Sequence, residues 1–540
     1  MKKFTLLFFS FFCLSVYAQQ WDWAKGGGGT TYDKANSLST DTAGNVFVTG
    51  SFRSPIITFG TTILTNTNTS GNTDDIFIAK YDANGNVLWA KRAGGVGRGS
   101  SVSADAGGNV FVTGESNGNV FISKYDANGN VLWAKSASGT NECAGFSVSA
   151  DPSGNVFVTG FFSGSTIIFG TTTLTNSVGY NVFLAKYDAN GNLLWAKSPS
   201  ETYYNYGNSV TADASGNVIV TGQFNGPSIT FGTSTLSNAT AGTDDLFIAK
   251  YDAQGNVLWA NRAGGGSYDV GYSISADKFG NTFVTGSFYS ATITFGSITL
   301  TNPNTNGYNK QFFIAKYDAN GNALWAKSKV GTSEDAGYSV CTDEIGNAFV
   351  TGYFSPSYST IIFDSITLTA PQGNCNYGCL PFFIVKYDAN GNVLCASALS
   401  SSDFNTAVST DRFGNAYVGG EFHSNPFIIG TDTLPLTGVG NIFVAKYTCN
   451  NNTVATNELS NEESISVFPN PSSGIFTINL KNKTVAIKIC VYDVMGNCLL
   501  NKDCHGEGSP TIDLSGLPKE IYFMKIVFDG KSVMKKIVMQ

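Results

Sequence analysis

The stretch Lys80-Tyr81-Asp82-Ala83-Asn84-Gly85-Asn86-Val87-Leu88-Trp89-Ala90-Lys91 decides the fold, because nearly the same letters return along the chain. Apolar residues flank an Asn-Gly pair, and both positions of a two-residue hairpin turn need the positive φ that Asn and Gly tolerate. Each copy therefore predicts a β-hairpin with such a turn. The other copies begin at Lys124, Lys186, Lys250, Lys316 and Lys386, and a degraded copy begins at Lys446.

A second motif precedes each hairpin and reads Gly-Asn followed by an apolar run. Every unit then aligns as four apolar segments, which we call A, B, C and D after 101–105, 109–114, 120–125 and 131–135. Recurrence of this size indicates a repeat architecture. The motif recurs with its glycine at Gly44, Gly108, Gly154, Gly216, Gly280, Gly346 and Gly414.

Segments B, C and D are apolar at successive positions, so we expect sheets that are covered on both faces. Four-stranded antiparallel sheets stacked face to face are the blades of a β-propeller. The second unit lacks an extra segment that stands between B and C at 58–65 in the first unit and at 168–175 in the third. The four strands are therefore the core of a unit, and the extra hairpin is an addition to it.

The two ends of the repeat region complement each other. The seventh unit stops after its C segment at 442–447, and the missing D segment is found at Trp21-Asp22-Trp23-Ala24-Lys25. We predict an all-β fold, a seven-bladed β-propeller over 19–448 that the N-terminal strand closes. An open superhelix or another number of blades is the alternative.

The repeats resemble the SBBP-type β-propeller repeats of bacteria in their Ala-Asp-x-x-Gly-Asn-Val-Phe-Val-Thr-Gly and Lys-Tyr-Asp-x-x-Gly-Asn-x-Leu-Trp motifs. The similarity covers roughly 20–448. It implies a propeller fold and a secreted setting, and it implies no particular ligand.

Residues 1–18 have the features of a secretory signal peptide: Lys2 and Lys3, an apolar run, and Val16-Tyr17-Ala18 as a cleavage site. The apolar run is shorter than the ~20 residues of a membrane-spanning helix. We expect cleavage near Ala18 and no integral membrane segment. Charged residues make up 13% of the chain and the net charge is −7, which argues against nucleic acid as a partner.

The C-terminal part differs from the repeats. Residues 449–464 are predicted to be a linker, and 465–540 a small Ig-like β-sandwich. This segment resembles the C-terminal sorting domain (the Por type A domain) of cargo of the type IX secretion system of Bacteroidota. Glu520 stands where that family usually has Gly. The matching residues are Pro469, Asn470, Pro471, Gly474, Gly496, Leu517, Tyr522, Lys535 and Lys536.

That resemblance implies the type IX machinery as a partner. It also implies a protein that is secreted or attached to the cell surface, often with a lipopolysaccharide anchor in place of the removed domain. An accessory domain that only binds a ligand is the alternative.

Removal of Cys13 with the signal leaves nine of the ten cysteines, so at least one thiol has no intrachain partner. We expect bridges Cys375–Cys379 and Cys498–Cys504 as candidates in an oxidising compartment. Cys341 and Cys395 replace residues inside repeated strands and are predicted to be buried free thiols.

Motifs for catalysis are sparse. The chain has two histidines, His423 and His505, in different domains. Gly114-Glu115-Ser116-Asn117-Gly118 matches the nucleophile elbow of α/β-hydrolases by chance, because that elbow requires a strand-to-helix turn. Asp82 and its counterparts are predicted to cap their own turns. We expect neither an enzyme nor a cofactor, and weak calcium binding by these turns is the alternative.

Variable residues gather in the B–C and D–A connections, which leave one face of the ring, and we expect the ligand there. The candidate residues are Tyr203, Tyr204, Tyr206, Tyr268 and Arg98, with packing of the tyrosines against a neighbouring blade as the alternative. The predicted function is binding of an extracellular glycan or protein, or adhesion. A polysaccharide lyase or glycosidase and a structural surface component are the alternatives.

Overall fold

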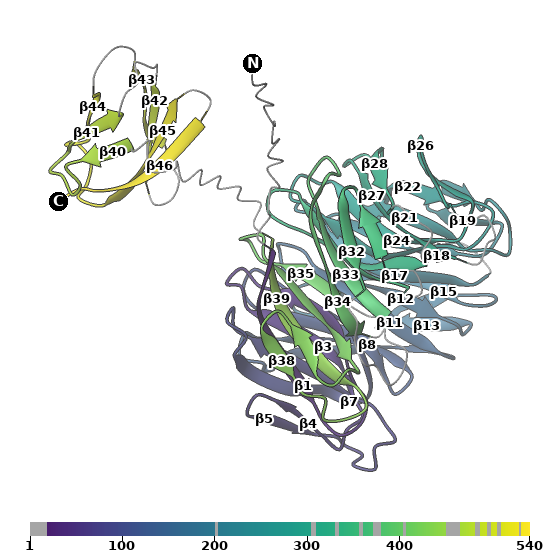
Figure 1. Cartoon of the computed structure of the whole chain (residues 1–540). Coiled ribbons are helices and arrows are strands. Elements are labelled where there is room, and N and C mark those ends of the chain that lie inside the picture. The colour runs from purple at the N-terminus through teal and green to yellow at the C-terminus, as the bar shows by residue number, and fades with distance from the viewer. Residues whose placement is uncertain are drawn as a thin grey trace, which may run out of the picture. The chain divides into compact units, whose positions relative to one another are not determined.

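A computed structural model describes residues 19–199, 203–303, 309–329, 334–355, 360–370, 380–402, 407–449, 465–480, 487–493, 498–504, 509–528 and 531–540. These residues form strands and turns, with no helix among them. They belong to two compact units that divide at Asn451, and each unit is described by itself (Figure 1).

The first unit consists of antiparallel sets of four strands, each in the order A, B, C, D, as predicted. We number the sets along the chain. Set 1 is β2 (Asp33–Thr40), β3 (Val46–Phe52), β6 (Asp75–Tyr81) and the start of β7 (Val87–Ala104); set 2 is the end of β7, β8 (Val110–Ser116), β9 (Asn119–Tyr125) and β10 (Val131–Gly139); set 3 is β11 (Cys143–Ala150), β12 (Val156–Phe162), β15 (Asn181–Tyr187) and β16 (Leu193–Lys197); set 4 is β17 (Asn205–Ala212), β18 (Val218–Phe224), β21 (Asp245–Tyr251) and β22 (Val257–Ala263); set 5 is β23 (Asp269–Ala276), β24 (Thr282–Phe288), β27 (Gln311–Tyr317) and β28 (Ala323–Lys327); set 6 is β29 (Asp335–Thr342), β30 (Ala348–Phe354), β33 (Leu380–Tyr387) and β34 (Val393–Ser402); set 7 is β35 (Ala407–Thr410), β36 (Ala416–Phe422), β39 (Asn441–Cys449) and β1 (Gln19–Gly28).

An extra hairpin between B and C accompanies every set except set 2. The hairpins are β4 (Ile56–Phe59) with β5 (Thr62–Thr65), β13 (Thr166–Phe169) with β14 (Thr172–Thr175), β19 (Ser228–Phe231) with β20 (Ser234–Ser237), β25 (Thr292–Phe295) with β26 (Ile298–Thr301), β31 (Thr360–Phe363) with β32 (Ile366–Thr369), and β37 (Phe427–Ile429) with β38 (Asp432–Leu434).

The N-terminal strand completes the last set. β1 pairs antiparallel with β39, with Trp23 opposite Lys446 and Gly26 opposite Phe443. The first strands of successive sets also lie beside one another, and β35 of set 7 contacts β2 of set 1. The predicted pairing of the Trp21–Lys25 segment with the last set is therefore confirmed.

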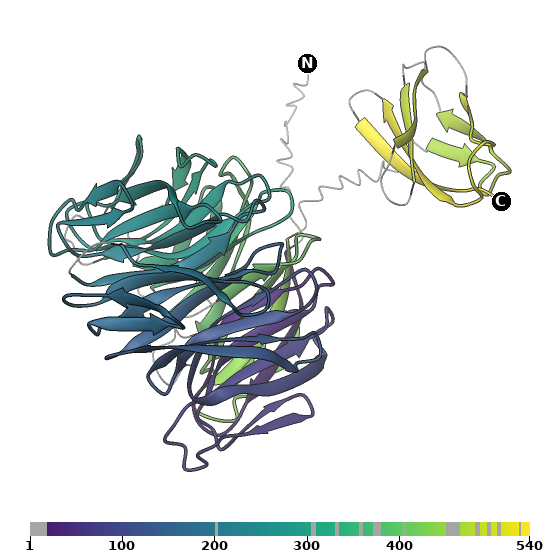
Figure 2. The same cartoon turned by 180° about the vertical axis from the view of Figure 1, so that it is seen from behind.

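The sets pack face to face (Figures 1 and 2). β3 and β6 are buried at every residue, as expected for strands covered on both faces. Shared clusters of apolar side chains fill the spaces between neighbouring sets, for example around Phe157, Val220 and Phe247. The first unit is thus a repeated β architecture of the propeller type.

The repeated turns differ in one respect from the prediction. Only the glycine has a positive φ, which is +81° at Gly85, whereas Asn84 does not. Asp82 accepts hydrogen bonds from the backbone N–H groups of Asn84 (2.9 Å) and Asn86 (2.8 Å), so the aspartate side chain stabilises a four-residue turn. Both residues of a two-residue turn have positive φ only at Asn117-Gly118, among the residues that the structure describes.

A repeated hydrogen bond joins neighbouring sets. The indole Nε1 of the D-strand tryptophan donates to the carbonyl of the alanine in the next set's C–D turn, as from Trp195 to Ala253 at 3.2 Å. Six junctions have this bond, including the one from Trp23 of the N-terminal strand to Ala83 at 3.0 Å. The junction between sets 6 and 7 has a disulfide instead, between Cys395 and Cys449.

The prediction that Cys395 is a free thiol is therefore wrong. Cys395 occupies the tryptophan position of set 6, and Cys449 occupies the alanine position of set 7. These are the two positions that meet at every other junction, so their Cα atoms lie 6.4 Å apart although 54 residues separate them in sequence. Cys341 is free, as predicted.

The proposed Cys498–Cys504 bridge is also wrong. Both residues lie on β43 (Cys498–Cys504), and an extended strand keeps residues six apart at about 20 Å. Cys504 is free. Cys375 and Cys379 lie outside the described residues.

The second unit contains two antiparallel sheets around a common core. One has the order β40 (Ile465–Phe468), β41 (Ile475–Leu480), β44 (Thr511–Asp513), and the other β43, β42 (Ile487–Tyr492), β45 (Ile521–Phe528), β46 (Lys531–Val538). Phe476, Ile489, Tyr522 and Met524 are among its buried residues.

Candidate binding cavity

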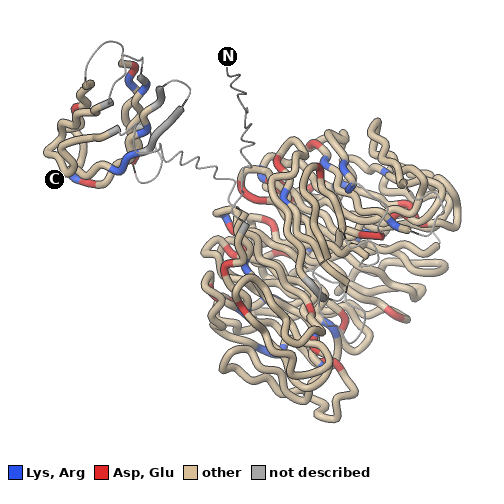
Figure 3. The backbone as a smooth tube through the Cα atoms, viewed as in Figure 1, with Lys and Arg blue, Asp and Glu red and all other residues tan. Residues whose placement is uncertain are grey.

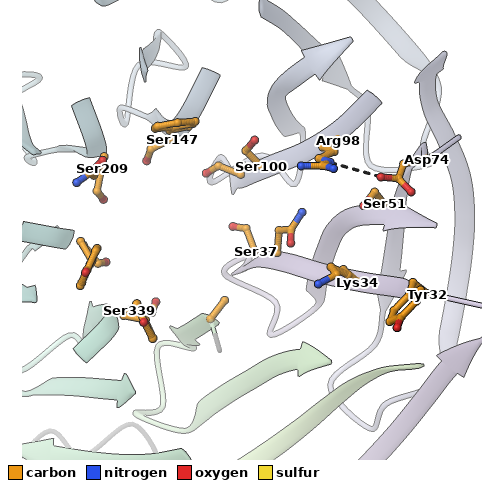
Figure 4. A pocket seen from close by; sticks show the side chains of 18 of the residues that line it. Tyr32, Lys34, Ser37, Ser51, Asp74, Arg98, Ser100, Ser147, Ser209 and Ser339 are labelled. Atoms are coloured by element: carbon orange, nitrogen blue, oxygen red, sulfur yellow. Dashed lines mark hydrogen bonds and ion pairs between the residues drawn. The ribbon is translucent and has the colours of Figure 1, made fainter. Parts of the chain in front are cut away.

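The A strands of the first unit surround a cavity of about 870 Å³. Figure 4 shows the side chains of Ser37, Ser147, Ser209 and Ser339 facing a common space from different strands. Charged side chains stand at one side of it. We call this space, with its lining residues, the central cavity.

One serine on the A strand of each of sets 1 to 6 connects its set with the next one. The Oγ atom of Ser147 accepts a hydrogen bond from the backbone N–H of Val210 at 3.1 Å, and Ser209 accepts one from Ile274 at 3.2 Å. Equivalent bonds connect the other serines with the following set. Each of these hydroxyl groups therefore uses one acceptor site for the scaffold and keeps its O–H as a donor.

A β-bulge beside each serine supplies the variable part of the lining. In set 1 the register passes from Ala35 opposite Gly50 directly to Ser37 opposite Thr49, so Asn36 has no partner in the strand pairing. The same irregularity occurs in the A strands of the next five sets. Bulges re-aim side chains. The bulge residues that line the cavity are Asn36, Ser100, Phe146, Asn208, Tyr272 and Tyr338.

The charged side of the cavity is formed mainly by residues of sets 1 and 2. Arg53 Nε lies 2.9 Å from Asp74 Oδ1, and Arg98 Nε lies 3.4 Å from Asp74 Oδ2. Lys34 Nζ contacts Glu421 Oε2 at 3.1 Å. The Asp74 carboxylate raises the pKa of Arg53 through a hydrogen bond and charge attraction. Arg98 keeps 67% of its side chain exposed, so it can meet a ligand.

The opposite side of the cavity is aromatic. The rings of Tyr272 and Tyr338 lie 5.0 Å apart, and Tyr338 stacks on Tyr353 at 5.7 Å. Tyr353 donates a hydrogen bond to Glu334 Oε1 at 3.0 Å. Burial raises the pKa of both Tyr272 and Tyr338. Aromatic faces next to hydroxyl and amide groups suit a sugar ring.

The structure separates the five predicted binding residues. Arg98 lines the central cavity. Tyr206 is half-buried and stacks on Phe146 (6.5 Å) and Tyr180 (5.5 Å), whereas Tyr203, Tyr204 and Tyr268 are 44%, 53% and 49% exposed and are not among the lining residues.

The sequence analysis missed Phe146, Tyr272 and Tyr338. The signal was present, because each follows the glycine of its A segment at a position that varies between otherwise similar repeats. Their convergence on one cavity needed the tertiary structure.

The repeated turns have little capacity left for a cation. In the turn at Asp188, the Oδ1 atom of this aspartate accepts hydrogen bonds from two backbone N–H groups. Its Oδ2 atom accepts a hydrogen bond from Asn192 Nδ2 at 2.8 Å. The hydrogen bonds from Asn192 lower the pKa of Asp188. Over the described part of the chain, no group of three His, Cys, Asp or Glu residues is placed to hold a metal ion.

The segment 114–118, which matches the nucleophile-elbow motif, forms a hairpin. Gly114 and Ser116 end β8, and Asn117-Gly118 turns the chain directly into β9. Ser116 is therefore on a strand-to-strand turn, which lacks the helix that a nucleophile elbow requires.

The sorting-motif residues gather at one place in the second unit. Asn470 Nδ2 donates to the carbonyl of Lys536 at 2.8 Å, and Asn470 Oδ1 accepts the N–H of Val538 at 2.9 Å. Tyr522 is buried, and its hydroxyl group donates to the carbonyl of Pro518 at 2.9 Å. These hydrogen bonds thus connect the motif residues near the start of the second unit with those near its end. Gly496 lies outside the described residues.

The sorting-motif residues not yet described lie beside these contacts. Pro469 and Pro471 flank Asn470 with cis peptide bonds, Gly474 has a φ of +140°, the N–H of Leu517 donates to Leu514, and Lys535 is on β46.

Lys and Arg are scattered along the first unit in this view and do not gather in a stripe (Figure 3). Within the described ranges, no helix has the length and hydropathy to cross a bilayer.

Residues 466–540 match the family "Secretion system C-terminal sorting domain". The second unit therefore carries the sorting domain of the type IX system, which indicates a protein that is secreted or attached to the cell surface.

The repeat region has weaker similarities. An uncharacterized WD repeat-containing protein of Acanthamoeba polyphaga mimivirus is 27% identical over 346 residues, which are 59% of this chain and 24% of that protein. The chain thus spans about a quarter of that relative.

Similar solved structures include Sqt1 from Chaetomium thermophilum (TM-score 0.38, 10% identity, 79% of this chain and 99% of that chain). TolB from Acinetobacter baumannii is another (TM-score 0.29, 10% identity, 74% of this chain and 79% of that chain).

Proposed function

We propose that this chain is an exported, non-enzymatic binding protein that holds an extracellular glycan or protein in the central cavity. The first unit acts as a closed seven-bladed β-propeller of SBBP type, and β1 completes its last blade. The observation that carries the proposal is the row of bulge residues, which are Asn, Ser, Phe or Tyr depending on the set and line a single cavity.

The proposed route of export depends on the N-terminal and C-terminal segments of the chain. Residues 1–18 act as a cleaved signal peptide, and the Ig-like second unit takes the chain through the type IX machinery of a bacterium of the Bacteroidota. The sorting-domain match at 466–540 supports this route. The mature protein is then released or remains on the outer surface.

The residues that line the cavity favour binding over glycoside hydrolysis. A glycosidase needs two carboxyl groups on opposite sides of the scissile bond. Among the described residues that line the cavity, Asp74 is the single carboxylate, and it is held by Arg53 and Arg98. A ligand with hydroxyl groups and an anionic substituent fits both sides of the cavity, because the aromatic side would stack on a ring and Arg98 would meet the anion.

The test is a screen of the mature chain, residues 19–540, on glycan and matrix-protein arrays. Tyr338→Ala and Arg98→Gln should each weaken binding of the ligand found by about tenfold or more, which corresponds to ~1.4 kcal/mol. Phe413→Ala is the matched control, because this phenylalanine is 69% exposed on the turn between β35 and β36, at the other end of the A strands. Equal binding by all three variants would refute the cavity as the site.

A further inference from the structure

The extra hairpins form a row around the first unit, and each occupies the same position. A hairpin contacts the D strand of its own set and the D strand of the preceding set, as β14 contacts β16 and β13 pairs with β10. In that pairing Phe169 lies opposite Ala137. The hairpin of set 1 likewise pairs with β1, with Phe59 opposite Gly27.

One aromatic contact holds every hairpin. A phenylalanine of the hairpin packs on the phenylalanine of the C strand, for example Phe169 on Phe183 at 5.1 Å and Phe231 on Phe247 at 4.9 Å. All six hairpins have this contact, at 4.9 to 5.1 Å. The six C-strand rings are fully buried.

Set 2 lacks the extra hairpin but has the surface on which the hairpin packs in the other sets. The two-residue turn Asn117-Gly118 replaces it. Phe121 stands at the C-strand position and is only half-buried, and no ring contact of Phe121 is found within the described ranges. The hairpin is therefore absent while the phenylalanine that would receive it is retained.

The neighbouring positions of set 2 are exposed in the same way. Val131 is 60% exposed, whereas its counterparts Val87 and Val257 are half-buried under the turns of their hairpins. Ala134 is exposed, whereas Ala90 and Ala196 are 5% and 9% exposed.

The edge of set 1 that faces this place has no strand partner among the described pairings. β7 pairs with β6 and β8, and the described strand pairings leave the backbone at 93–95 unpaired on the outer side, where Gly94 is exposed and Ala93 is buried at 3% exposure. These residues are the counterparts of Gly27 and Ala137, which receive hairpins in sets 7 and 2. We call Phe121, Val131, Ala134 and the edge at 93–95 the open hairpin position.

We propose that the open hairpin position docks a β-hairpin of a partner protein. The occupant is uncharged, rich in Thr and Ser, and carries an Ile-x-Phe pair on its first strand, because that chemistry fills the neighbouring positions at Ile57-Thr58-Phe59 and Ile167-Ile168-Phe169. The open position continues a row of six established interfaces of the same kind. Backbone pairing with the β7 edge supplies affinity, and contact of the partner's phenylalanine with Phe121 supplies specificity.

The probe is a labelled synthetic peptide with the sequence of residues 165–176, and fluorescence anisotropy measures its binding to the mature full-length chain. We expect saturable binding at one site. Val131→Glu places a charge on an exposed residue of the interface and should weaken binding at least tenfold, with the fold intact. Leu194→Ser is the matched control at an outward residue of set 3, 52% exposed, and should bind as the wild type does.

A graft provides the second measurement. Replacing Asn117-Gly118 with a copy of residues 163–180, the segment between the equivalent strand ends of set 3, gives set 2 its own hairpin, so it should abolish peptide binding and raise the melting temperature by several degrees. Absence of saturable binding to the wild type would overturn the proposal. Undiminished binding to the graft would overturn it too, because the peptide would then be exchanging with the other hairpins.

Discussion

Loss of the Cys395–Cys449 disulfide should destabilise the first unit strongly. The bridge closes a loop of 54 residues. In the chain-entropy model such a cross-link removes about 14 cal/mol/K from the unfolded ensemble, which is about 4 kcal/mol at 25 °C. Cys449→Ser should therefore lower the free energy of unfolding by about 4 kcal/mol, a large part of the ~5–15 kcal/mol of a typical domain.

The assay is urea denaturation of the mature chain, followed by tryptophan fluorescence, with and without dithiothreitol. Reductant should shift the wild-type midpoint to that of Cys449→Ser and leave the variant unchanged. Cys341→Ser is the control for loss of a thiol alone, since Cys341 is free, and should leave the reductant effect in place.

A double variant tests why the bridge stands at this junction. Cys395→Trp with Cys449→Ala restores the residue types of the other six junctions. An indole N–H bond to the carbonyl of residue 449 should recover about 1 kcal/mol relative to Cys395→Ser with Cys449→Ala. A Cys449→Ser variant as stable as the wild type would refute the stabilising role of the disulfide, and no gain in Cys395→Trp with Cys449→Ala would refute the structural correspondence between this junction and the other six.

Three further predictions concern the scaffold. Trp195→Phe removes the bond from Nε1 to the Ala253 carbonyl and should cost about 1 kcal/mol, measured by the urea midpoint. Gly255→Ala should cost about 1–3 kcal/mol in the same assay, because Gly255 has a φ of +81° and an added Cβ would lie 3.1 Å from Trp195. Burial outweighs the hydrogen bonds from Ser290 and Gly265 and raises the pKa of Asp269 to about 7, so the folded chain binds a proton that the unfolded chain, with a pKa of 3.8, has released. Wild-type stability should therefore fall by up to about 4 kcal/mol as the pH rises from about 4 to about 7, and Asp269→Asn should lack this slope; parallel stability curves for the two proteins would contradict the assignment.

Local chemistry explains why much of the fold was predictable. A turn that is closed by Asp82 and Gly85, between two apolar runs, specifies its hairpin with residues that are adjacent in sequence. Repetition then multiplied that signal along the first unit. The Trp21–Lys25 segment could be assigned to the last set because its letters match a D strand, and β1 pairs with β39 as expected.

The same reasoning failed where the relevant neighbour is distant in sequence. Cys395 was interpreted from its own strand, but its partner is 54 residues away on another set. The prediction of a positive φ at Asn84 was wrong. The side chain of Asp82 accepts hydrogen bonds from the backbone N–H groups of the turn, so the turn needs no second residue with positive φ.

The sequence alone determined the β-hairpins, the number of repeated units and the sorting-domain resemblance, since each depends on contiguous residues. Only the tertiary structure decided which side chains share the central cavity. Tyr272 and Tyr338 come from different sets, and their rings lie 5.0 Å apart because face-to-face packing of the sets puts their A-strand bulges next to each other.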